Sequence, residues 1–138
     1  MHAEDGRFCW FDLAAVDVAA AKRFYADAFG WRFADVRANG GVFTRCSDAD
    51  GRDVASLYQL RRDDVERGAA SHWTAYLAVA DVAVAARRVA AAGGRVLVQP
   101  FAVEDVARIA LVEDAVGAVF GVWQTQAQSP PLPSRRAP

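Results

Sequence analysis

The sequence has few of the residues on which catalytic and metal centres are commonly built. It holds only two histidines and two cysteines. Cys9 and Cys46 each stand in an apolar, strand-like run without a partner at metal-binding spacing, so we expect both to be small buried hydrophobic groups. Four of the five prolines fall in the last nine residues, which predicts a disordered, proline-rich tail over residues 127–138.

The sequence also lacks a strong excess of charge and any long apolar run. A formal net charge of −1 argues against a nucleic-acid partner, because such proteins carry a basic surface. No run approaches the roughly twenty apolar residues of a membrane span, and the N-terminus has no apolar signal region. With 54% hydrophobic residues in 138, we expect a globular, cytoplasmic domain or two small modules that share a core.

What the sequence does contain is an internal repeat. Residues 13–30 can be laid over residues 77–94 at a constant offset of 64 (77 − 13 = 64), and ten of the eighteen pairs are identical. Several of the identical pairs are alanine on alanine, so the evidence for the repeat comes mainly from the ordered series Leu, Asp-Val, Arg and Gly. A repeat of this kind predicts a duplicated structural unit.

Each half has the pattern of a strand, a helix and three further strands. Asp17 and Asp81 stand where a helix N-cap is expected, and Gly30 and the pair Gly93-Gly94 stand where the helices should end. Alternating apolar runs separated by turn residues predict the strands. The predicted strands cover residues 8–14, 31–36, 41–46 and 53–60 in the first half, and 73–79, 95–98, 106–113 and 118–124 in the second.

These elements predict an α+β fold of two βαβββ modules. The first module should cover residues 8–60 and the second residues 72–126, with an N-terminal extension over residues 1–7. The charged residues 61–71 between the modules are expected to be a solvated linker.

Alternation along the first strand of each module sorts its side chains between two faces. Cys9, Phe11 and Leu13 should pack under the first helix, and Trp73, Ala75, Leu77 and Val79 under the second. The opposite faces carry aromatic and polar groups, a mixture typical of ligand pockets, and we expect them to converge on one concave surface. They consist of Trp10, Asp12 and Ala14 in the first module and His72, Thr74 and Tyr76 in the second.

The whole pattern resembles the vicinal oxygen chelate superfamily, which includes glyoxalase I, extradiol dioxygenases and the bleomycin and fosfomycin resistance proteins. The resemblance covers residues 8–124 and is carried by residues 17–31, residues 81–94 and the ending at residues 114–124. It implies a curved sheet or barrel built from the two modules. Fold alone does not determine the reaction.

The resemblance also implies where a catalytic metal would be held, and this sequence departs from it there. Counting seven residues back from each capping Asp gives Trp10 (17 − 7) and Thr74 (81 − 7). Counting four forward from each turn Gly gives Ala55 (51 + 4) and Gly121 (117 + 4). None of these four residues is a usual ligand of a divalent metal, so no cofactor is expected.

A displaced metal site stays open as an alternative. His72 and Asp12 could face the same cavity, but a third ligand is harder to find, because nothing places Glu104 or Glu113 nearby. Asp12 itself should be hydrogen-bonded to a neighbour such as Tyr76, solvated, or available to a ligand, since an unpaired buried carboxylate is costly. If its surroundings are dry, its pKa should be raised and it could act as an acid or base.

We therefore expect a metal-independent protein that binds a small, partly aromatic or apolar molecule. The predicted contacts are Trp10, Asp12, Thr74, Tyr76 and Trp123. An enzyme of the lyase, isomerase or dioxygenase kind with a non-standard metal site is the alternative. The family resemblance also implies a homodimer, and a dimeric ferredoxin-like barrel is a second possible fold.

Overall fold

A computed structural model describes residues 5–38 and 40–126 of the chain. The described chain forms two compact units. One is Trp10–Ala75, here the N-terminal unit; the other, the C-terminal unit, runs from Tyr76 onward and includes the first described residues up to Cys9. The predicted proline-rich tail, residues 127–138, lies outside the described residues. None of the helices in the described ranges is long and apolar enough to cross a membrane.

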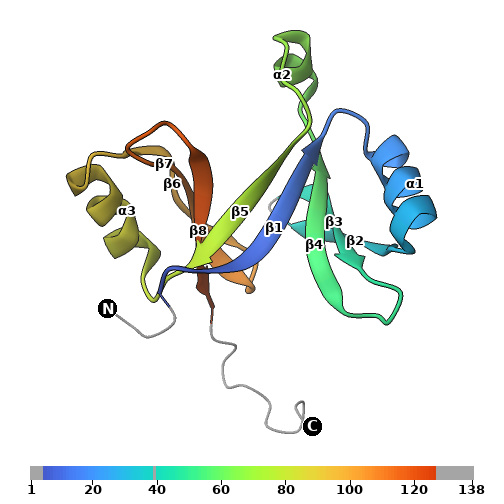
Figure 1. Ribbon diagram of the computed structural model, residues 1–138, viewed down its shortest axis with the longest axis horizontal. Coiled ribbons are helices and arrows are strands. Elements are labelled where there is room, and N and C mark those ends of the chain that lie inside the picture. Colours follow the sequence, from blue (N-terminus) through green and yellow to red (C-terminus); the bar gives the residue numbers. More distant parts are fainter. Residues whose placement is uncertain (1–4, 39, 127–138) are drawn as a thin grey trace, which may run out of the picture. The chain divides into compact units, whose positions relative to one another are not determined.

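The N-terminal unit holds one βαβββ module with the strand order β2-β3-β4-β1 (Figure 1). β1 and β4 run parallel, and the other neighbours are antiparallel. The elements are β1 (Arg7–Ala15), α1 (Val18–Phe29), β2 (Arg32–Ala38), β3 (Gly41–Ser47) and β4 (Asp53–Gln59).

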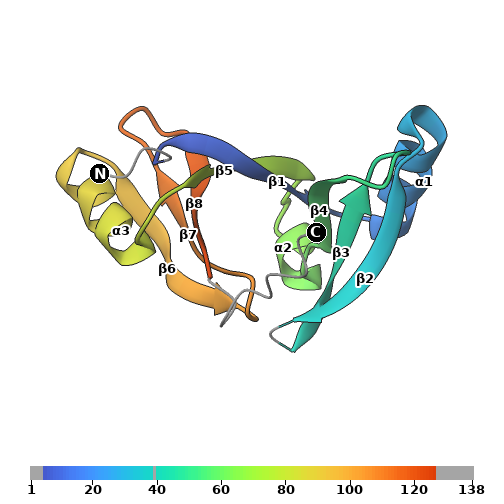
Figure 2. The ribbon, with the colours of Figure 1, turned by 90° about the horizontal axis from the view of Figure 1, so that it is seen from below.

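The C-terminal unit repeats this arrangement with the strand order β5-β8-β7-β6. β5 and β8 again run parallel, and α3 lies alongside β6, β7 and β8 (Figure 2). The elements are β5 (His72–Ala78), α3 (Val82–Ala91), β6 (Arg95–Val103), β7 (Ala107–Glu113) and β8 (Val119–Thr125). Residues 72–75 of β5 belong to the N-terminal unit. The α+β fold of two βαβββ modules is therefore confirmed.

Both module helices begin at the predicted aspartates. Asp17 Oδ1 accepts a hydrogen bond of 3.0 Å from the Ala20 N–H. The Oδ1 atom of Asp81 accepts from the N–H groups of Ala83 and Val84, at 2.9 and 3.1 Å. These carboxylates satisfy N–H groups that the first helical turn leaves without an internal partner.

A helix that the sequence did not predict, α2 (Arg62–Glu66), stands in the segment after β4. Asp63 and Asp64 lie in its first turn, where the helix dipole favours negative charge. The five-residue helix is too short to produce a recognisable apolar period, so only the charge of the segment was visible in the sequence.

The core of the N-terminal unit lies between α1 and the sheet. Five buried residues form its centre, and Val18, Ala21 and Tyr25 of α1 pack against them. Phe29, at the end of the helix, is 62% exposed. The five central residues are Leu13, Ala15, Cys46, Ala55 and Leu57.

The prediction for the first strand was wrong in part, because α1 covers only the end of β1. Leu13 and Ala15 lie in the core, but Phe11 is 45% exposed and Cys9 is exposed as well. Cys46 is buried as expected. In β5, Trp73 contacts the ring of Tyr25 in α1 at a centroid distance of 5.9 Å, so it does not pack under α3 as predicted.

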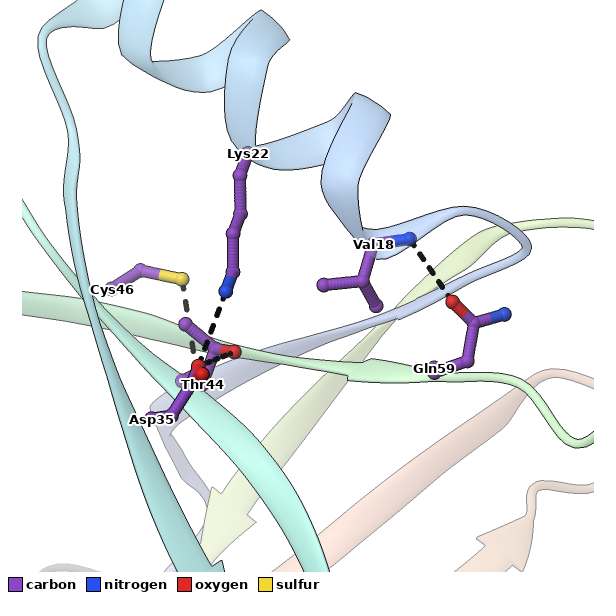
Figure 3. A network of polar contacts seen from close by, with 6 residues as sticks. All are labelled: Val18, Lys22, Asp35, Thr44, Cys46 and Gln59. Carbon is purple, nitrogen blue, oxygen red and sulfur yellow. Dashed lines mark hydrogen bonds and ion pairs between the residues drawn. The ribbon is translucent and has the colours of Figure 1, made fainter.

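Polar contacts attach α1 to the sheet (Figure 3). Lys22 Nζ donates to Asp35 Oδ1 on β2 at 3.1 Å, and Thr44 Oγ1 on β3 donates to the same oxygen at 2.7 Å. The hydrogen bond from Thr44, followed by that from Lys22, lowers the pKa of Asp35. At the start of the helix the Val18 N–H donates to Gln59 Oε1 at 3.1 Å, which ties α1 to the end of β4.

Candidate functional site

A chain of three side chains lies on the sheet face of the N-terminal unit that is turned away from α1. Trp10 Nε1 donates to Ser56 Oγ at 2.9 Å, and Ser56 Oγ donates to Asp12 Oδ1 at 2.7 Å. Leu13 and Leu57, one residue further along each strand, lie in the core on the α1 side. Because neighbouring residues of a strand point to opposite faces, the three polar side chains share the other face.

A β-bulge explains why Ser56 belongs to this cluster. On β3 Cys46 pairs with Ala55, while the next residue, Ser47, pairs with Asp53. Val54 is therefore an extra residue in β4. Such an insertion turns every following side chain of the strand to the other face.

The bulge corrects the assignment of Ala55, which counting from the turn glycine had placed at a metal-ligand position. Ala55 is 1% exposed and lies in the core against α1, so it cannot be the metal-site equivalent on the open face. In the strand register Ser56 lies opposite Asp12, and Gly121 lies opposite Tyr76 in the other module. The two turns are 66 residues apart (117 − 51), but Ser56 and Gly121 are only 65 apart (121 − 56), as one inserted residue requires.

Asp12 lies in surroundings that favour its neutral form. Burial raises the pKa of the Asp12 carboxyl, and the hydrogen bond from Ser56 and the charge of His72 oppose the rise. The carboxylate in turn contributes to the raised pKa of Tyr58, whose largest cause is burial. Tyr58 follows Ser56 by two residues on β4, so it stands on the same face. The cluster thus offers a carboxyl group that holds its proton more tightly than a solvated aspartate does.

Arg45 brings a positive charge to the same rung of the sheet. It pairs with Ser56 in the register of β3 and β4, so the two side chains share a face. Its Nε lies 4.0 Å from Asp53 Oδ2, and both side chains are half-exposed, so this ion pair is weak. Arg45 was not among the residues chosen from the sequence.

Two further residues of the N-terminal unit were predicted at the site. Thr74 is partly buried on β5. His72, at the start of β5, is exposed, and its Nδ1 lies 2.9 Å from the carbonyl oxygen of Ala70. His72 lies close enough to Asp12 for its charge to lower the pKa of the carboxyl, and a shared cavity of the two residues stays a prediction.

Tyr76 and Trp123, the other predicted contacts, meet in the C-terminal unit. Their rings pack edge to face at a centroid distance of 5.9 Å, and Tyr76 is 5% exposed. Trp123 Nε1 donates to Thr125 Oγ1 at 3.2 Å. A Cβ atom placed on Gly121 would overlap the ring of Tyr76, so that ring fills the space where a side chain at position 121 would start.

Comparison with known proteins shows the family to which this chain belongs. A family model described as the Glyoxalase/Bleomycin resistance protein/Dioxygenase superfamily matches residues 7–122. The chain belongs to this superfamily. The resemblance inferred from the sequence, which concerns the same group of proteins, is thereby confirmed.

Two curated relatives match most of this chain. The chain is 35% identical over 117 residues to "Putative glyoxylase CFP32" of Mycobacterium tuberculosis, covering 83% of this chain and 44% of the relative. It is also 35% identical over 130 residues to the anthracycline biosynthesis protein DnrV of Streptomyces peucetius, covering 86% and 47%. The chain therefore spans about half the length of the curated relatives it matches.

Solved structures of the superfamily share the fold at lower identity. Methylmalonyl-CoA epimerase of Streptomyces coelicolor, in complex with 2-nitronate-propionyl-CoA, matches with a TM-score of 0.62 at 20% identity, covering 88% of this chain and 98% of that chain. The enzyme of the same name from Mycobacterium tuberculosis matches with a TM-score of 0.63 at 14% identity, covering 98% and 95%. These likenesses establish the fold.

The residues at the superfamily's metal positions do not fit a metal ion. Corrected for the bulge, the positions hold Trp10, Ser56, Thr74 and Gly121, which together provide two hydroxyl groups and no carboxylate or imidazole. Divalent catalytic metals take at least three nitrogen or oxygen ligands, chiefly from His, Asp and Glu. Within the described ranges no group of three or more His, Cys, Asp or Glu side chains is arranged to hold an ion.

Sequence reasoning missed Ser56 because of the bulge in β4, and it missed Arg45 because its place beside Ser56 depends on the register of β3 and β4. A constant offset between the two modules hides a single inserted residue, so β4 was assigned the wrong face beyond the bulge. The sequence did contain one sign of the correct face, because Ser56 is a polar residue in the apolar run 54–57 and a polar residue is expected on the face away from the core.

Proposed function

We propose that this domain binds a small organic molecule on the face that carries Trp10, Ser56 and Asp12, without the metal ion of its metalloenzyme relatives. The observation that supports the proposal is the hydrogen-bonded chain from Trp10 Nε1 through Ser56 Oγ to Asp12 Oδ1. It fixes an aromatic ring beside a partly desolvated carboxyl group. Ligand pockets typically combine an apolar wall with a few such fixed polar groups.

The chemistry of the face favours a flat, largely apolar ligand that donates a hydrogen bond. The Trp10 indole contributes aromatic surface to the face, and the Asp12 carboxyl, whose Oδ1 accepts from Ser56 Oγ, supplies acceptor oxygens for a donor group of the ligand. Arg45 on the same rung suits an electron-rich oxygen of the ligand. Thr74, in the same unit, is a predicted ligand contact of this face, and Tyr76 and Trp123 remain predicted ligand contacts on the C-terminal unit.

Two classes of probe follow from the relatives. DnrV is named for anthracycline biosynthesis, and an anthracycline is a flat aromatic molecule with several hydroxyl groups. The epimerase structures include a complex with methylmalonyl-CoA, which is a large anion. Trp10 and Asp12 favour the first probe, because a desolvated carboxylate repels an anionic ligand.

Calorimetric titration of the protein with an anthracycline, and separately with methylmalonyl-CoA, tests the proposal. Replacing Trp10 by Ala or Asp12 by Asn should weaken anthracycline binding about tenfold, the effect of losing one stacking contact or one charged hydrogen bond. Asp63→Asn on α2 is the matched control, because it removes the same charge away from this face. Equal affinities of all variants, or no binding of either probe, would overturn the proposal.

An enzymatic function with a non-standard metal is the second candidate, and the proximity of His72 to Asp12 favours it. Elemental analysis of protein purified without chelator distinguishes the two. A stoichiometric metal that is lost in His72→Ala would support the enzyme, whereas anthracycline binding by metal-free protein supports the binding function.

The sequence-based expectations of a homodimer and of a cytoplasmic location are also part of this proposal. Light scattering at micromolar concentration tests the first, and a monomer there would contradict it. Fractionation of cells that produce the protein tests the second.

A further inference from the structure

A cavity of about 440 Å³ lies in the C-terminal unit, between α3 and the strands β5 and β8. Its walls are mainly apolar and include Leu77, Val79, Val84, Val89, Phe120 and Val122. Leu77 and Val122 are sequence neighbours of Tyr76 and Gly121, which point to the other face of the sheet. The cavity is therefore separate from the candidate site described above.

The internal repeat explains why the C-terminal unit has a cavity here. At the offset of 64, Val89 corresponds to Tyr25 and Arg95 corresponds to Trp31. In the N-terminal unit Tyr25 packs on the core and stacks on Trp31 at a centroid distance of 4.7 Å, so two large rings lie against the core beside α1. Val89 is much smaller than Tyr25.

Arg95 does not replace the volume of Trp31 either. Its side chain is 70% exposed, and its Nε donates to Glu113 Oε1 at 3.1 Å. Phe120, which corresponds to Ala55 at the bulge-corrected offset of 65 (120 − 55), restores part of the lost volume. Protein interiors are normally packed without large voids, and an unfilled apolar cavity lowers stability. The cavity under α3 is therefore suited to binding a ligand.

The charged side chains around the cavity indicate the charge that a ligand would carry. Asp5 Oδ1 accepts from the Ala80 N–H at 2.9 Å, and the Asp81 carboxylate caps α3, so both acidic groups already have hydrogen-bond donors. Arg88 also lines the cavity, in the last turn of α3. Among the ion pairs of the described chain, none involves Arg88.

Arg88 is the repeat equivalent of Phe24 (24 + 64), so a cation stands at the cavity where the first module has an aromatic ring. An apolar cavity with one available guanidinium group matches a molecule with an apolar body and a single anionic end. The cavity volume falls in the range of pockets that hold small ligands.

We propose that this cavity is a second binding site, which takes a small amphipathic monocarboxylate. The hydrocarbon part of the ligand lies between α3 and the strands β5 and β8. Its carboxylate pairs with the Arg88 guanidinium at the cavity wall. Neither role involves the residues of the Trp10, Ser56 and Asp12 face.

Isothermal titration with decanoate, below its micelle concentration, tests the proposal, with decanol as the uncharged counterpart. Decanoate should bind more tightly than decanol to the unchanged protein. Arg88→Gln should weaken decanoate binding about tenfold and leave decanol binding unaltered, because it removes one charge-assisted pair. Val89→Tyr restores the residue of the first module and should abolish binding of both probes.

Asp12→Asn is the control that separates this site from the proposed function, and it should bind decanoate as the unchanged protein does. No binding of decanoate, or binding that neither Arg88→Gln nor Val89→Tyr alters, would overturn the proposal. Loss of decanoate binding in Asp12→Asn would overturn it as well, by placing the ligand on the other face. If Val89→Tyr does not fold, as thermal unfolding would show, the comparison of decanoate with decanol in Arg88→Gln decides alone.

Discussion

The ring of Tyr76 occupies the space in which any side chain at Gly121 would have to begin. The two residues are register partners in the parallel pairing of β5 and β8, and a Cβ at position 121 would overlap ring carbons of Tyr76. The sequence resemblance implies that metal-dependent members of the family hold a ligand at the position of Gly121. A ligand side chain at position 121 and the Tyr76 ring in its present place would exclude each other.

Replacement of Gly121 by Ala should destabilise the protein. The added methyl group must displace the Tyr76 ring, and overpacking of this kind typically costs about 1–3 kcal/mol. Urea unfolding measures the loss. In a Tyr76→Ala background the same replacement should cost much less, so the two changes should be strongly non-additive. Additive effects would show that the ring is not the obstacle.

The stability of the protein should depend on the charge of Asp12, and Asp12→Asn should remove this dependence. Burial raises the pKa of Asp12 in the folded chain above that of the unfolded chain, so the folded state binds this proton more tightly. The associated stability is present below the unfolded pKa and is lost as the pH rises through the folded pKa. The melting temperature of Asp12→Asn relative to the unchanged protein should therefore increase from pH 4 to pH 8. A constant difference across this range would contradict the assignment.

The two thiols should differ in reactivity. Burial raises the pKa of Cys46 to about 11, with a further contribution from the charge of Asp12, and its side chain lies in the core. Cys9 is exposed, although partial burial raises the pKa of its thiol as well. At pH 8 a colorimetric thiol reagent should modify one cysteine of the native protein and both after unfolding. Native Cys9→Ser should show no reaction, and equal rates for both thiols would count against a buried Cys46.

A glutamine at the end of the last strand of each module holds the start of the module helix. Gln59 Oε1 accepts from the Val18 N–H, and its Nε2 donates to the Val16 carbonyl at 2.8 Å. Gln124 Oε1 accepts from the Val82 N–H at 2.8 Å. Each Gln→Ala replacement should cost about 1 kcal/mol or more in urea unfolding, with Gln59→Ala the more severe. Gln99→Ala, on the exposed part of β6, is the control and should change little.

Local patterns in the sequence were enough to predict the module architecture. Asp17 and Asp81 could be predicted as helix caps because a short carboxylate directly before a helix can accept hydrogen bonds from the N–H groups of its first turn. Apolar runs between turn residues predicted each of the eight strands of the described chain, although β6 extends to Val103 and the predicted strand ended at Val98. These features depend on neighbouring residues, which a sequence displays directly.

Features that depend on a register were not visible in the sequence. The bulge at Val54 moved Ala55 into the core and brought Ser56 to Asp12. Ser56 is a polar residue in an apolar run, but it does not show by itself where the extra residue lies. Cys9 was expected in the core because its neighbours are apolar, but how far α1 reaches along β1 is a property of tertiary packing. The replacement of Tyr25 and Trp31 by Val89 and Arg95 can be read from the repeat, but whether other side chains fill the space under α3 depends on tertiary packing.

The parallel pairing of the first and last strand in each module has a consequence for how the chain folds. Asp12 and its partner Ser56 are 44 residues apart, and Tyr76 and Gly121 are 45 apart (121 − 76). The local hairpins of β2 to β4 and β6 to β8 can form early, but closing such long loops is entropically slow. During synthesis, neither first strand can find its partner until the end of its module has left the ribosome. We therefore expect β1 and β5 to be the last strands that each module incorporates.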